Sequence, residues 1–377
     1  MAVLTLSGLT RRAREAPVQE ALPEHYFDAS EDETAHKIAT AKEILGRKLV
    51  ILGHHYQRDE VIRWADYTGD SYKLARYGAD RRDADFIVFC GVHFMAESAD
   101  ILAADHQRVI LPNMTAGCSM ADMADIHQVE ECWAHLTRIV PERIIPITYM
   151  NSAANLKAFV GEHGGAVCTS SNARTVLDWA FQQGDKVLFF PDQHLGRNTG
   201  LRMGIPGEQM VVWDPWALCG GAPAHEYRDA RILLWKGHCS VHGRFTVDQI
   251  RQARADFPGI RVVVHPECVQ EVVDAADDFG STERIVKLVQ ASEPGAQFAI
   301  GTEINLVNRL AHEHPGKRII CLDPVVCPCS TMYRIHPAYV RWVLDNLLDG
   351  RVKNEIVVAD DIKRWARVAL DRMLSLA

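Results

Sequence analysis

Short runs rich in β-branched and other apolar residues alternate with longer amphipathic stretches along the chain. Two of these runs are "RKLVILGHHYQ", which we expect to form a strand ending at His54, and "IRVVVHPECV", which we expect to form one ending at His265. Strand-like runs that alternate with helix-length stretches are typical of βαβ units and parallel sheets. The pattern therefore predicts an α/β protein.

The two runs open a repeat within the chain. A strand-end histidine, a hydroxyl residue in a glycine-containing turn that opens a helix, and a cysteine recur at one offset of 211 positions: His54 and His265, Ser71 and Thr282, Cys118 and Cys329. Further strand-like runs follow in both segments, first "FIVFCG" and "FAIGTE", then "RVILPN" and "RIICLDP". Self-similarity at a fixed offset indicates duplicated structural units.

A looser third copy lies between these two segments. The run "RIIPITYMNS" predicts a strand ending at Tyr149 to Asn151, Ser170 precedes a helix, and "RILLWKGHC" predicts a last strand ending at Cys239. The copy is longer because of a Gly-, Pro- and Trp-rich insertion at about 196–228, which reads as an irregular surface loop.

We therefore expect three homologous three-layer αβα domains, with small parallel sheets, in a pseudo-threefold arrangement around a central active site. The first domain would comprise 35–118 together with the C-terminal helices of 330–377. The second would comprise 119–239 and the third 240–329. Residues 1–34 would form an N-terminal extension.

Composition and charge narrow the class of function. A hydrophobic content of 47% suits packed globular cores, and the net charge of −8 comes without any basic run. This argues against nucleic-acid or membrane partners and favours small-molecule chemistry. No apolar run reaches the roughly 18 residues of a membrane span, and the N-terminus lacks a signal-peptide core. We expect a cytoplasmic protein whose ten cysteines are thiols.

The repeated residues predict a site where the three units meet. Ligands of parallel α/β sheets bind beyond the carboxyl ends of the strands, near helix N-termini that favour anions. His54, Tyr149, Asn151, His265 and Glu267 would lie at strand ends, with the three hydroxyl residues at helix starts. Three converging thiolates suit a [4Fe–4S] cluster with one open iron, although zinc held by three thiolates and water is a competing interpretation.

Each residue also has an ordinary structural explanation. A serine or threonine before a helix is usually an N-cap, and a buried cysteine is usually packing. The joint recurrence at one offset is what favours a site. Cys327 is the rival of Cys329, and the 64-residue spacing from His265 selects Cys329. In "LWKGHCSVHGRF" we assign ligation to Cys239, and we expect His238 and His242 either to support the residues that bind the metal or to have structural roles.

From about residue 35 to the C-terminus the sequence resembles the quinolinate synthase family of bacterial de novo NAD biosynthesis. The motifs that carry the resemblance are "GHHYQRDEVIRWADYTGDSYKLAR", "PNMTAGCSMADM", "YMNS", "VCTSSNA", "KGHCSVH", "HPEC", "GSTERIV", "GTEINLVNRL" and "CPCSTMYRI". The resemblance implies three α/β domains around one [4Fe–4S] cluster held by three cysteines. These would be Cys118, Cys239 and Cys329, leaving one iron open as a Lewis acid.

The implied reaction condenses iminoaspartate (iminosuccinate), supplied by an L-aspartate-oxidising enzyme, with dihydroxyacetone phosphate. It yields quinolinate, phosphate and two waters. The matched substrate-binding positions are His54, Ser71, Tyr149, Met150, Asn151, Ser170, His265, Pro266, Glu267 and Thr282. Tyr56, His265 and Glu267 are the expected catalytic residues. A monomer or homodimer is expected. The alternatives are a zinc-dependent hydrolase and an iron–sulfur redox sensor.

Overall fold

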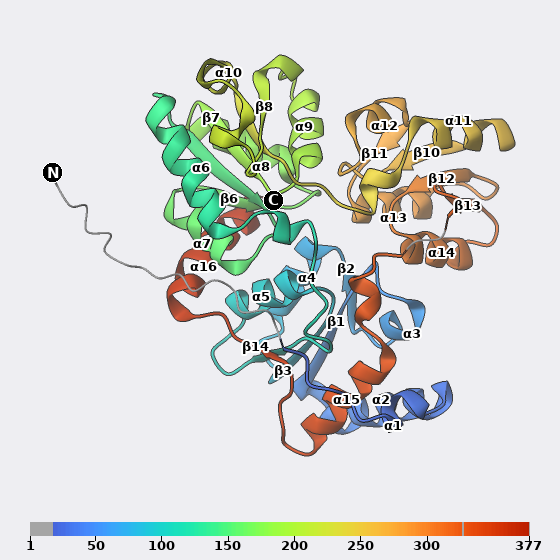
Figure 1. Ribbon diagram of the computed structural model, residues 1–377. Helices are drawn as coiled ribbons and strands as arrows, with labels where there is room; N and C mark the ends of the chain where they lie inside the picture. Colours follow the sequence, from blue (N-terminus) through green and yellow to red (C-terminus); the bar gives the residue numbers. More distant parts are fainter. Residues whose placement is uncertain (1–17, 326–327, 377) are drawn as a thin grey trace.

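The computed structural model describes residues 18–325 and 328–376, which form an α/β protein built from three sheet-containing units (Figure 1). The first sheet has the order β2-β1-β3-β4-β14. Its strands run parallel, except that β14 is antiparallel to β4. The strands are β1 (Leu49–His54), β2 (Tyr67–Gly69), β3 (Phe86–Cys90), β4 (Arg108–Ile110) and β14 (Glu355–Ile356).

The second and third sheets are wholly parallel. The second has the order β6-β5-β7-β9-β8, and the third β11-β10-β12-β13. Strands of the second are β5 (Ile144–Tyr149), β6 (Ala166–Cys168), β7 (Lys186–Phe190), β8 (Met210–Trp213) and β9 (Ile232–Trp235). Those of the third are β10 (Arg261–Val264), β11 (Asp278–Phe279), β12 (Gln297–Gly301) and β13 (Arg318–Cys321).

Helices flank each sheet. The first unit has α1 (His25–Asp28), α2 (Glu31–Leu45), α3 (Asp59–Ile62), α4 (Ser71–Asp80) and α5 (His93–Leu102). The second has α6 (Ile126–Ile139), α7 (Ala154–Glu162), α8 (Ala173–Gln183), α9 (Gln193–Arg202) and α10 (Ala224–Asp229). The third has α11 (Val247–Asp256), α12 (Gln270–Ala275), α13 (Thr282–Ala291) and α14 (Ile304–Glu313), and the chain ends with α15 (Pro337–Leu348) and α16 (Asp360–Ser375).

The three units share one topology. In each, the second strand lies at one edge beside the first, and two later strands follow on the other side, as in β2-β1-β3-β4, β6-β5-β7-β9 and β11-β10-β12-β13. In the second unit the additional strand β8 precedes β9 in the chain and lies beyond it in the sheet. The predicted α/β fold with three homologous parallel-sheet units is therefore confirmed. Among the described residues, no helix combines the length and apolar character that crossing a membrane requires.

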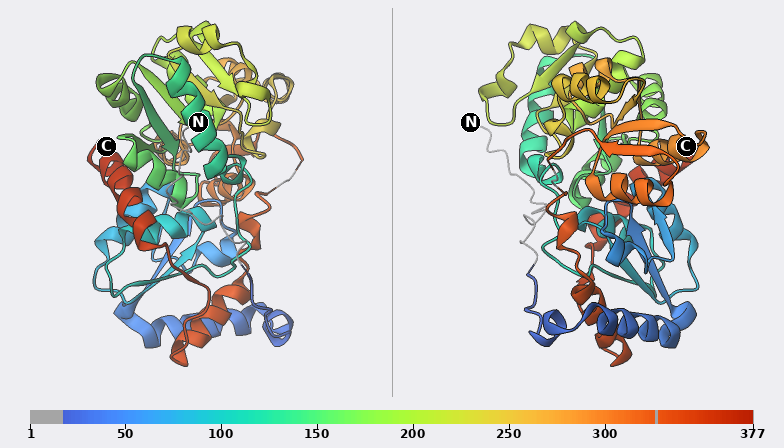
Figure 2. Two further views of the ribbon diagram at one scale, coloured as in Figure 1. Left: turned by 60° about the vertical axis from the view of Figure 1, so that its left-hand side comes forward. Right: turned by 90° about the vertical axis from the view of Figure 1, so that its right-hand side faces the viewer.

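The C-terminal segment returns to the first two units. Helix α15 packs on α2 and strand β14 extends the first sheet, whereas α16 lies along α7 and β6 of the second unit (Figure 2). The contact between α7 and α16 is close. A Cβ atom on Gly161 of α7 would lie 2.0 Å from the Trp365 carbonyl oxygen of α16. Glycine is therefore required where these helices cross.

The insertion at about 196–228 is not the irregular loop that its composition predicts. It contains the end of α9, the strand β8, which pairs in parallel with β9 and extends the second sheet, and the short helix α10. Met210 and Trp213 of β8 are buried, and the Trp213 ring packs on Tyr227 of α10. Burial of these apolar side chains stabilises an extra strand despite the many breaker residues around it.

The first two units share one hydrophobic core, whereas the third unit has hydrophobic cores of its own. The buried side chains of the first two units and of α15 and α16 form one continuous cluster. The third unit has two separate clusters of its own, one containing Val262 and Val264 and the other Val263 and Ile300. Because alternate residues of β10 point to opposite faces, these clusters lie on the two sides of the third sheet.

Candidate active site

The three units converge on one cavity with an empty volume of about 650 Å³. Twelve of the residues predicted for the site line it: His54, Tyr56, Ser71, Cys118, Tyr149, Asn151, Ser170, Cys239, His265, Glu267, Thr282 and Cys329. Two predicted residues are not among the lining residues. Met150 is fully buried, with its sulfur 3.4 Å from the Ser98 hydroxyl, and the Pro266 carbonyl accepts a hydrogen bond from Asn198.

Each unit contributes a ring side chain where its first strand ends. His54 and Tyr149 are the last residues of β1 and β5, and His265 follows the last residue of β10. In the parallel pairing with the edge strands, His54 of β1 lies opposite Gly69 of β2, and Tyr149 of β5 lies opposite Cys168 of β6. The carboxyl ends of the parallel strands thus hold these three rings at equivalent positions around the cavity.

The hydroxyl residues Ser71, Ser170 and Thr282 follow the short edge strands β2, β6 and β11. Ser71 and Thr282 are the first residues of α4 and α13, and they do not cap these helices. The caps are their neighbours Asp70 and Ser281, which accept hydrogen bonds from the backbone N–H groups of Lys73 and Arg284. The hydroxyls of Ser71 and Thr282 are thereby left for other partners. The simple N-cap explanation is wrong for both.

The two strand-end histidines share one tautomer. The backbone N–H of Tyr56 donates to Nδ1 of His54 at 3.2 Å, and that of Glu267 donates to Nδ1 of His265 at 3.3 Å. Since Nδ1 accepts in both rings, Nε2 carries the hydrogen. Burial lowers the pKa of His54 well below its usual value and that of His265 to about 3. Both rings are therefore neutral donors.

Glu267 is the centre of a buried hydrogen-bond network. Its Oε1 accepts from the Tyr149 hydroxyl at 2.6 Å, and its Oε2 lies 2.8 Å from Nδ1 of His242. Burial alone would raise the pKa of Glu267. The neighbouring imidazoles of His265 and His242, with the hydrogen bonds from His242 and Tyr149, reverse this and lower it. Glu267 is thus a carboxylate at neutral pH.

Tyr56 joins the same network from the first unit. Its hydroxyl lies 2.9 Å from the hydroxyl of Thr302 and 3.1 Å from that of Thr282. Burial raises the pKa of Tyr56 and of Tyr149 well above the usual value, and the charge of Glu267 raises both further. Both phenols are therefore protonated and can donate.

His242 lies beside the predicted residues of the site and contacts them. It lines the cavity, its ring stacks on that of His265 with centroids 4.3 Å apart, and its Nε2 lies 3.0 Å from the Thr302 hydroxyl. His238 is exposed instead. His242 is the third residue after Cys239 and begins a short 3₁₀ helix, and this turn places its ring in the cavity wall.

The three predicted ligand cysteines stand in one local pattern. A 3₁₀ helix begins three residues after each of them, at Ala121, His242 and Met332, and an α-helix begins eight residues after each, at Ile126, Val247 and Pro337. The backbone N–H four residues on bonds to the carbonyl of Cys118, Cys239 and Cys329 at 2.9 to 3.0 Å. This shared turn places Cys329 in register with the other two. Cys327 lies outside the described residues.

The three thiols are near neighbours in the cavity wall. Cys118 and Cys329 both contribute electrostatically to the raised pKa of Cys239, and Cys329 contributes to that of Cys118. Burial is the main cause in both residues, and it raises the pKa of Cys118 to about 12. The backbone N–H of Ala121 lowers the pKa of Cys118, and the backbone N–H of His242 lowers the pKa of Cys239. Such amides favour a thiolate.

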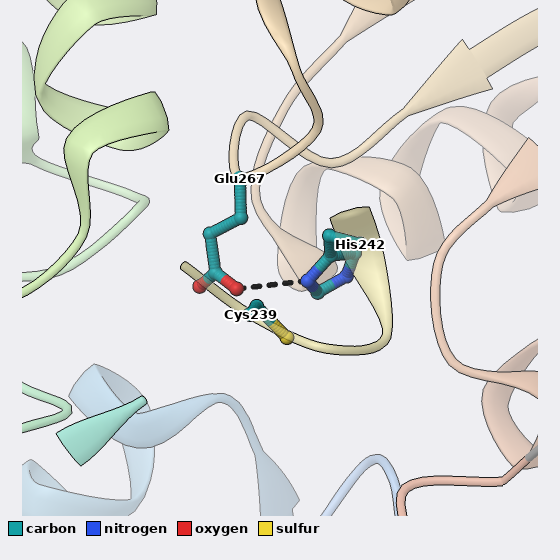
Figure 3. Close-up of side chains that lie close together, drawn as sticks. All are labelled: Cys239, His242 and Glu267. Carbon is teal, nitrogen blue, oxygen red and sulfur yellow. Dashed lines mark hydrogen bonds and ion pairs between the residues drawn. The ribbon is translucent and has the colours of Figure 1, made fainter. Parts of the chain in front are cut away.

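Cys239, His242 and Glu267 also form a compact group whose possible metal-binding atoms lie within 4.8 Å of one another (Figure 3). However, both ring nitrogens of His242 and both oxygens of Glu267 already lie within hydrogen-bonding distance of protein groups. The arrangement is that of a satisfied polar network, in which a metal ion would displace hydrogen bonds.

The chain matches the family model "Quinolinate synthetase A protein" over residues 36–375. The chain belongs to this family. A relative from Corynebacterium glutamicum, named quinolinate synthase, is 60% identical over 362 residues, covering 96% of this chain and 92% of the relative. Relatives of the same name from Acidobacterium capsulatum and Geobacillus kaustophilus are 57% identical over 357 residues and 53% over 358. Each of these two matches covers 94% of this chain. The first covers 95% of the Acidobacterium capsulatum protein, and the second covers 97% of the Geobacillus kaustophilus protein.

The family resemblance predicted from the motifs is therefore confirmed, and the chain is an enzyme. In this member of the quinolinate synthetase A family, sequence reasoning missed a further set of lining residues. They are mostly apolar side chains and residues beside known motif positions: Asp70, Val92, Phe94, Met95, Met120, Thr169, Val241, Thr331 and Met332. Among the described lining residues there is no lysine or arginine.

Proposed function

We propose that this chain condenses iminoaspartate with dihydroxyacetone phosphate to give quinolinate, phosphate and two waters. The observation that carries the proposal is the meeting of three equivalent cysteine turns with three strand-end rings in one cavity. Family membership supports the same activity, because the relatives are named quinolinate synthase.

The residues present fit the cofactor implied for this reaction. Cys118, Cys239 and Cys329 would hold a [4Fe–4S] cluster, since all three thiols line one cavity and two of them have backbone amides beside the sulfur. When bound, such a cluster would supply an open iron as a Lewis acid for the dehydration chemistry.

The carboxylates of iminoaspartate would be bound by neutral donors. His54 and His265 present Nε2–H groups, and the hydroxyls of Ser71 and Ser170 line the same wall. Asn151 also lines the cavity, and its side-chain NH₂ group would add a further neutral donor. Neutral donors bind anions without the cost of burying an unpaired lysine or arginine.

The triose phosphate would lie toward the third unit. Thr282 begins the ten-residue helix α13, whose N-terminus favours negative charge. Loss of phosphate and closure of the ring require proton transfers. Glu267, as a carboxylate, would accept a proton, and Tyr56, as a protonated phenol, would donate one, with His265 completing the acid–base set.

The experiment that tests this function is an iron and sulfide count on the anaerobically purified protein, together with an assay for quinolinate from the two proposed substrates. About four irons and four sulfides with product formation are expected. Zinc in a colourless protein would contradict the proposal and favour the hydrolase. Four irons without product would favour the redox sensor.

Cys239→Ala tests the ligand assignment. Loss of one of three thiolates should abolish the iron content and the absorbance near 400 nm, because no described cysteine lies in the equivalent turn to replace it. Cys219→Ala, at an exposed cysteine of the same unit, is the matched control and should keep both. Retention of the chromophore by Cys239→Ala would overturn the assignment.

A further inference from the structure

Glu303 occupies a place that the proposed mechanism does not use. It lies two residues after β12, is fully buried, and is the N-cap of α14, where its Oε2 accepts the backbone N–H of Asn305 at 2.8 Å. Its other oxygen, Oε1, accepts the backbone N–H of Cys329 at 3.1 Å. One carboxylate therefore joins a helix start to the cysteine turn of the third unit.

Helix capping does not explain why this residue is glutamate. Serine, threonine, aspartate and asparagine are the usual N-caps, because their short side chains reach the helix N–H groups directly. Asp192 shows this in the second unit. It also lies two residues after the third strand of its unit, and its Oδ1 caps α9 at 2.6 Å. Its Oδ2 is buried and makes no well-formed hydrogen bond among the described residues, although the backbone N–H of Cys239 lies close enough to lower the pKa of this carboxyl group.

The other two units hold their cysteine turns by backbone contacts. His93 N–H, at the start of α5, donates to Ala116 O, and Gln193 N–H, at the start of α9, donates to Gly237 O. Both carbonyls lie two residues before the ligand cysteine. The equivalent residue in the third unit is Cys327, outside the described residues. The described tie between α14 and the Cys329 turn is the carboxylate of Glu303.

Glu303 also connects this turn to the catalytic tyrosine. The Asn305 amide donates to Glu303 Oε1 at 2.9 Å and to the backbone carbonyl of Tyr56 at 3.3 Å. Further along α14, Arg309 donates to the carbonyls of His55 and Gln57. Hydrogen bonds from α14 thus fix the position of the segment that contains Tyr56 relative to the turn that contains Cys329.

We propose that Glu303 is a positioning residue that fixes Cys329 as the third ligand of the cluster. It does so by accepting the Cys329 backbone N–H at Oε1 while Oε2 caps α14. This rests on the proposed function, since it concerns the cluster implied there. Residues that orient metal ligands without touching the metal typically change metal affinity by about 10- to 100-fold when replaced.

Two substitutions separate positioning from capping. Glu303→Asp keeps a good N-cap but withdraws the oxygen from Cys329. Glu303→Gln keeps an amide oxygen within reach of Cys329, but its NH₂ group cannot accept the Asn305 N–H. We expect Glu303→Asp to keep a near-normal thermal midpoint and to release iron to a chelator about 10- to 100-fold faster. Glu303→Gln should show the reverse, a lower midpoint with near-normal iron release.

The measurement uses anaerobically reconstituted holoprotein and follows the absorbance near 400 nm after addition of an iron chelator. Glu313→Asp, at an exposed glutamate on the same helix, is the control and should match the wild type. Normal iron release from Glu303→Asp, or release that simply follows the thermal midpoint in both variants, would overturn the inference. A wild-type protein without four irons would instead contradict the proposed function itself.

Discussion

At the scale of single residues, the site depends on which groups are neutral and which are charged. The rings of His54 and His265 accept a backbone N–H at Nδ1 and remain neutral, while Glu267 remains ionised among donors from two units. The described residues that line the cavity include no lysine or arginine, so anions would bind there through hydrogen bonds from neutral groups. The carboxylate of Glu267, at the centre of the network, can still accept a proton.

Glu267→Gln tests the role of this carboxylate. The amide keeps the shape and can still accept from Tyr149, but it cannot take up a proton. Turnover should therefore fall by about 10²- to 10⁴-fold while the iron content stays unchanged. Steady-state rates and iron analysis on the same preparation check this. Glu271→Gln, at a nearby exposed glutamate, should behave as wild type. A variant that keeps most of its turnover would exclude Glu267 as the base.

The fixed offset located a histidine, a hydroxyl residue and a cysteine in the first and third units, and a looser copy pointed to Tyr149, Ser170 and Cys239 in the second. All of these side chains line the cavity. The repeat located them because duplicated units keep equivalent residues at similar spacings. It could not assign His242 or Glu303. Their roles come from contacts with Glu267, Thr302 and Cys329, which the fold alone brings together. Local sequence carries no signal for such contacts.

At the scale of elements, the long central strands and most helices were predictable from their apolar periodicity. The edge strands β2 and β11 were not, since three and two residues are too few to show alternation. Strand β8 was hidden by the glycines and prolines around it. Its existence depends on burial of Met210 and Trp213 against the second unit, which is tertiary information.

The crossing of α7 and α16 gives a prediction at this scale. Gly161→Ala should destabilise the protein by about 1–3 kcal/mol, because its Cβ would overlap the Trp365 carbonyl and force the helices apart. Gly78→Ala in α4 is the matched control, since its Cβ would meet only Leu52 at 3.5 Å. Alanine favours a helix over glycine, so this variant should be neutral or slightly stabilised. Thermal unfolding measures both, and equal midpoints would contradict the close crossing.

At the scale of the whole molecule, polar contacts attach the third unit to the first, in contrast to the continuous apolar core of the first two units. Glu283 of α13 binds Nε2 of His55 at 3.0 Å and Nζ of Lys73 at 3.1 Å. The hydrogen bond with His55, followed by that with Lys73, lowers the pKa of Glu283 to about 2.

This contact predicts a pH-dependent stability. Because the folded pKa is below the usual 4.5, the contribution of Glu283 is fully present above about pH 4.5 and is lost as the pH falls toward 2. Wild type should therefore exceed Glu283→Gln in urea midpoint at pH 6.5, and the difference should shrink at pH 3.5. Glu293→Gln, exposed in the same unit, should show no such trend. A difference that stays constant between the two pH values would contradict the assignment.

The common turn after each predicted ligand cysteine has a consequence for biosynthesis. Each turn leads into the first helix of the following segment, and the last turn, at Cys329, comes close to the end of the 377-residue chain. If these three thiols hold the cluster, a growing chain has the first at residue 118 and the second at residue 239, and it lacks the complete set until residue 329 has been added. A complete cluster would then have to be inserted after all three units have been synthesised.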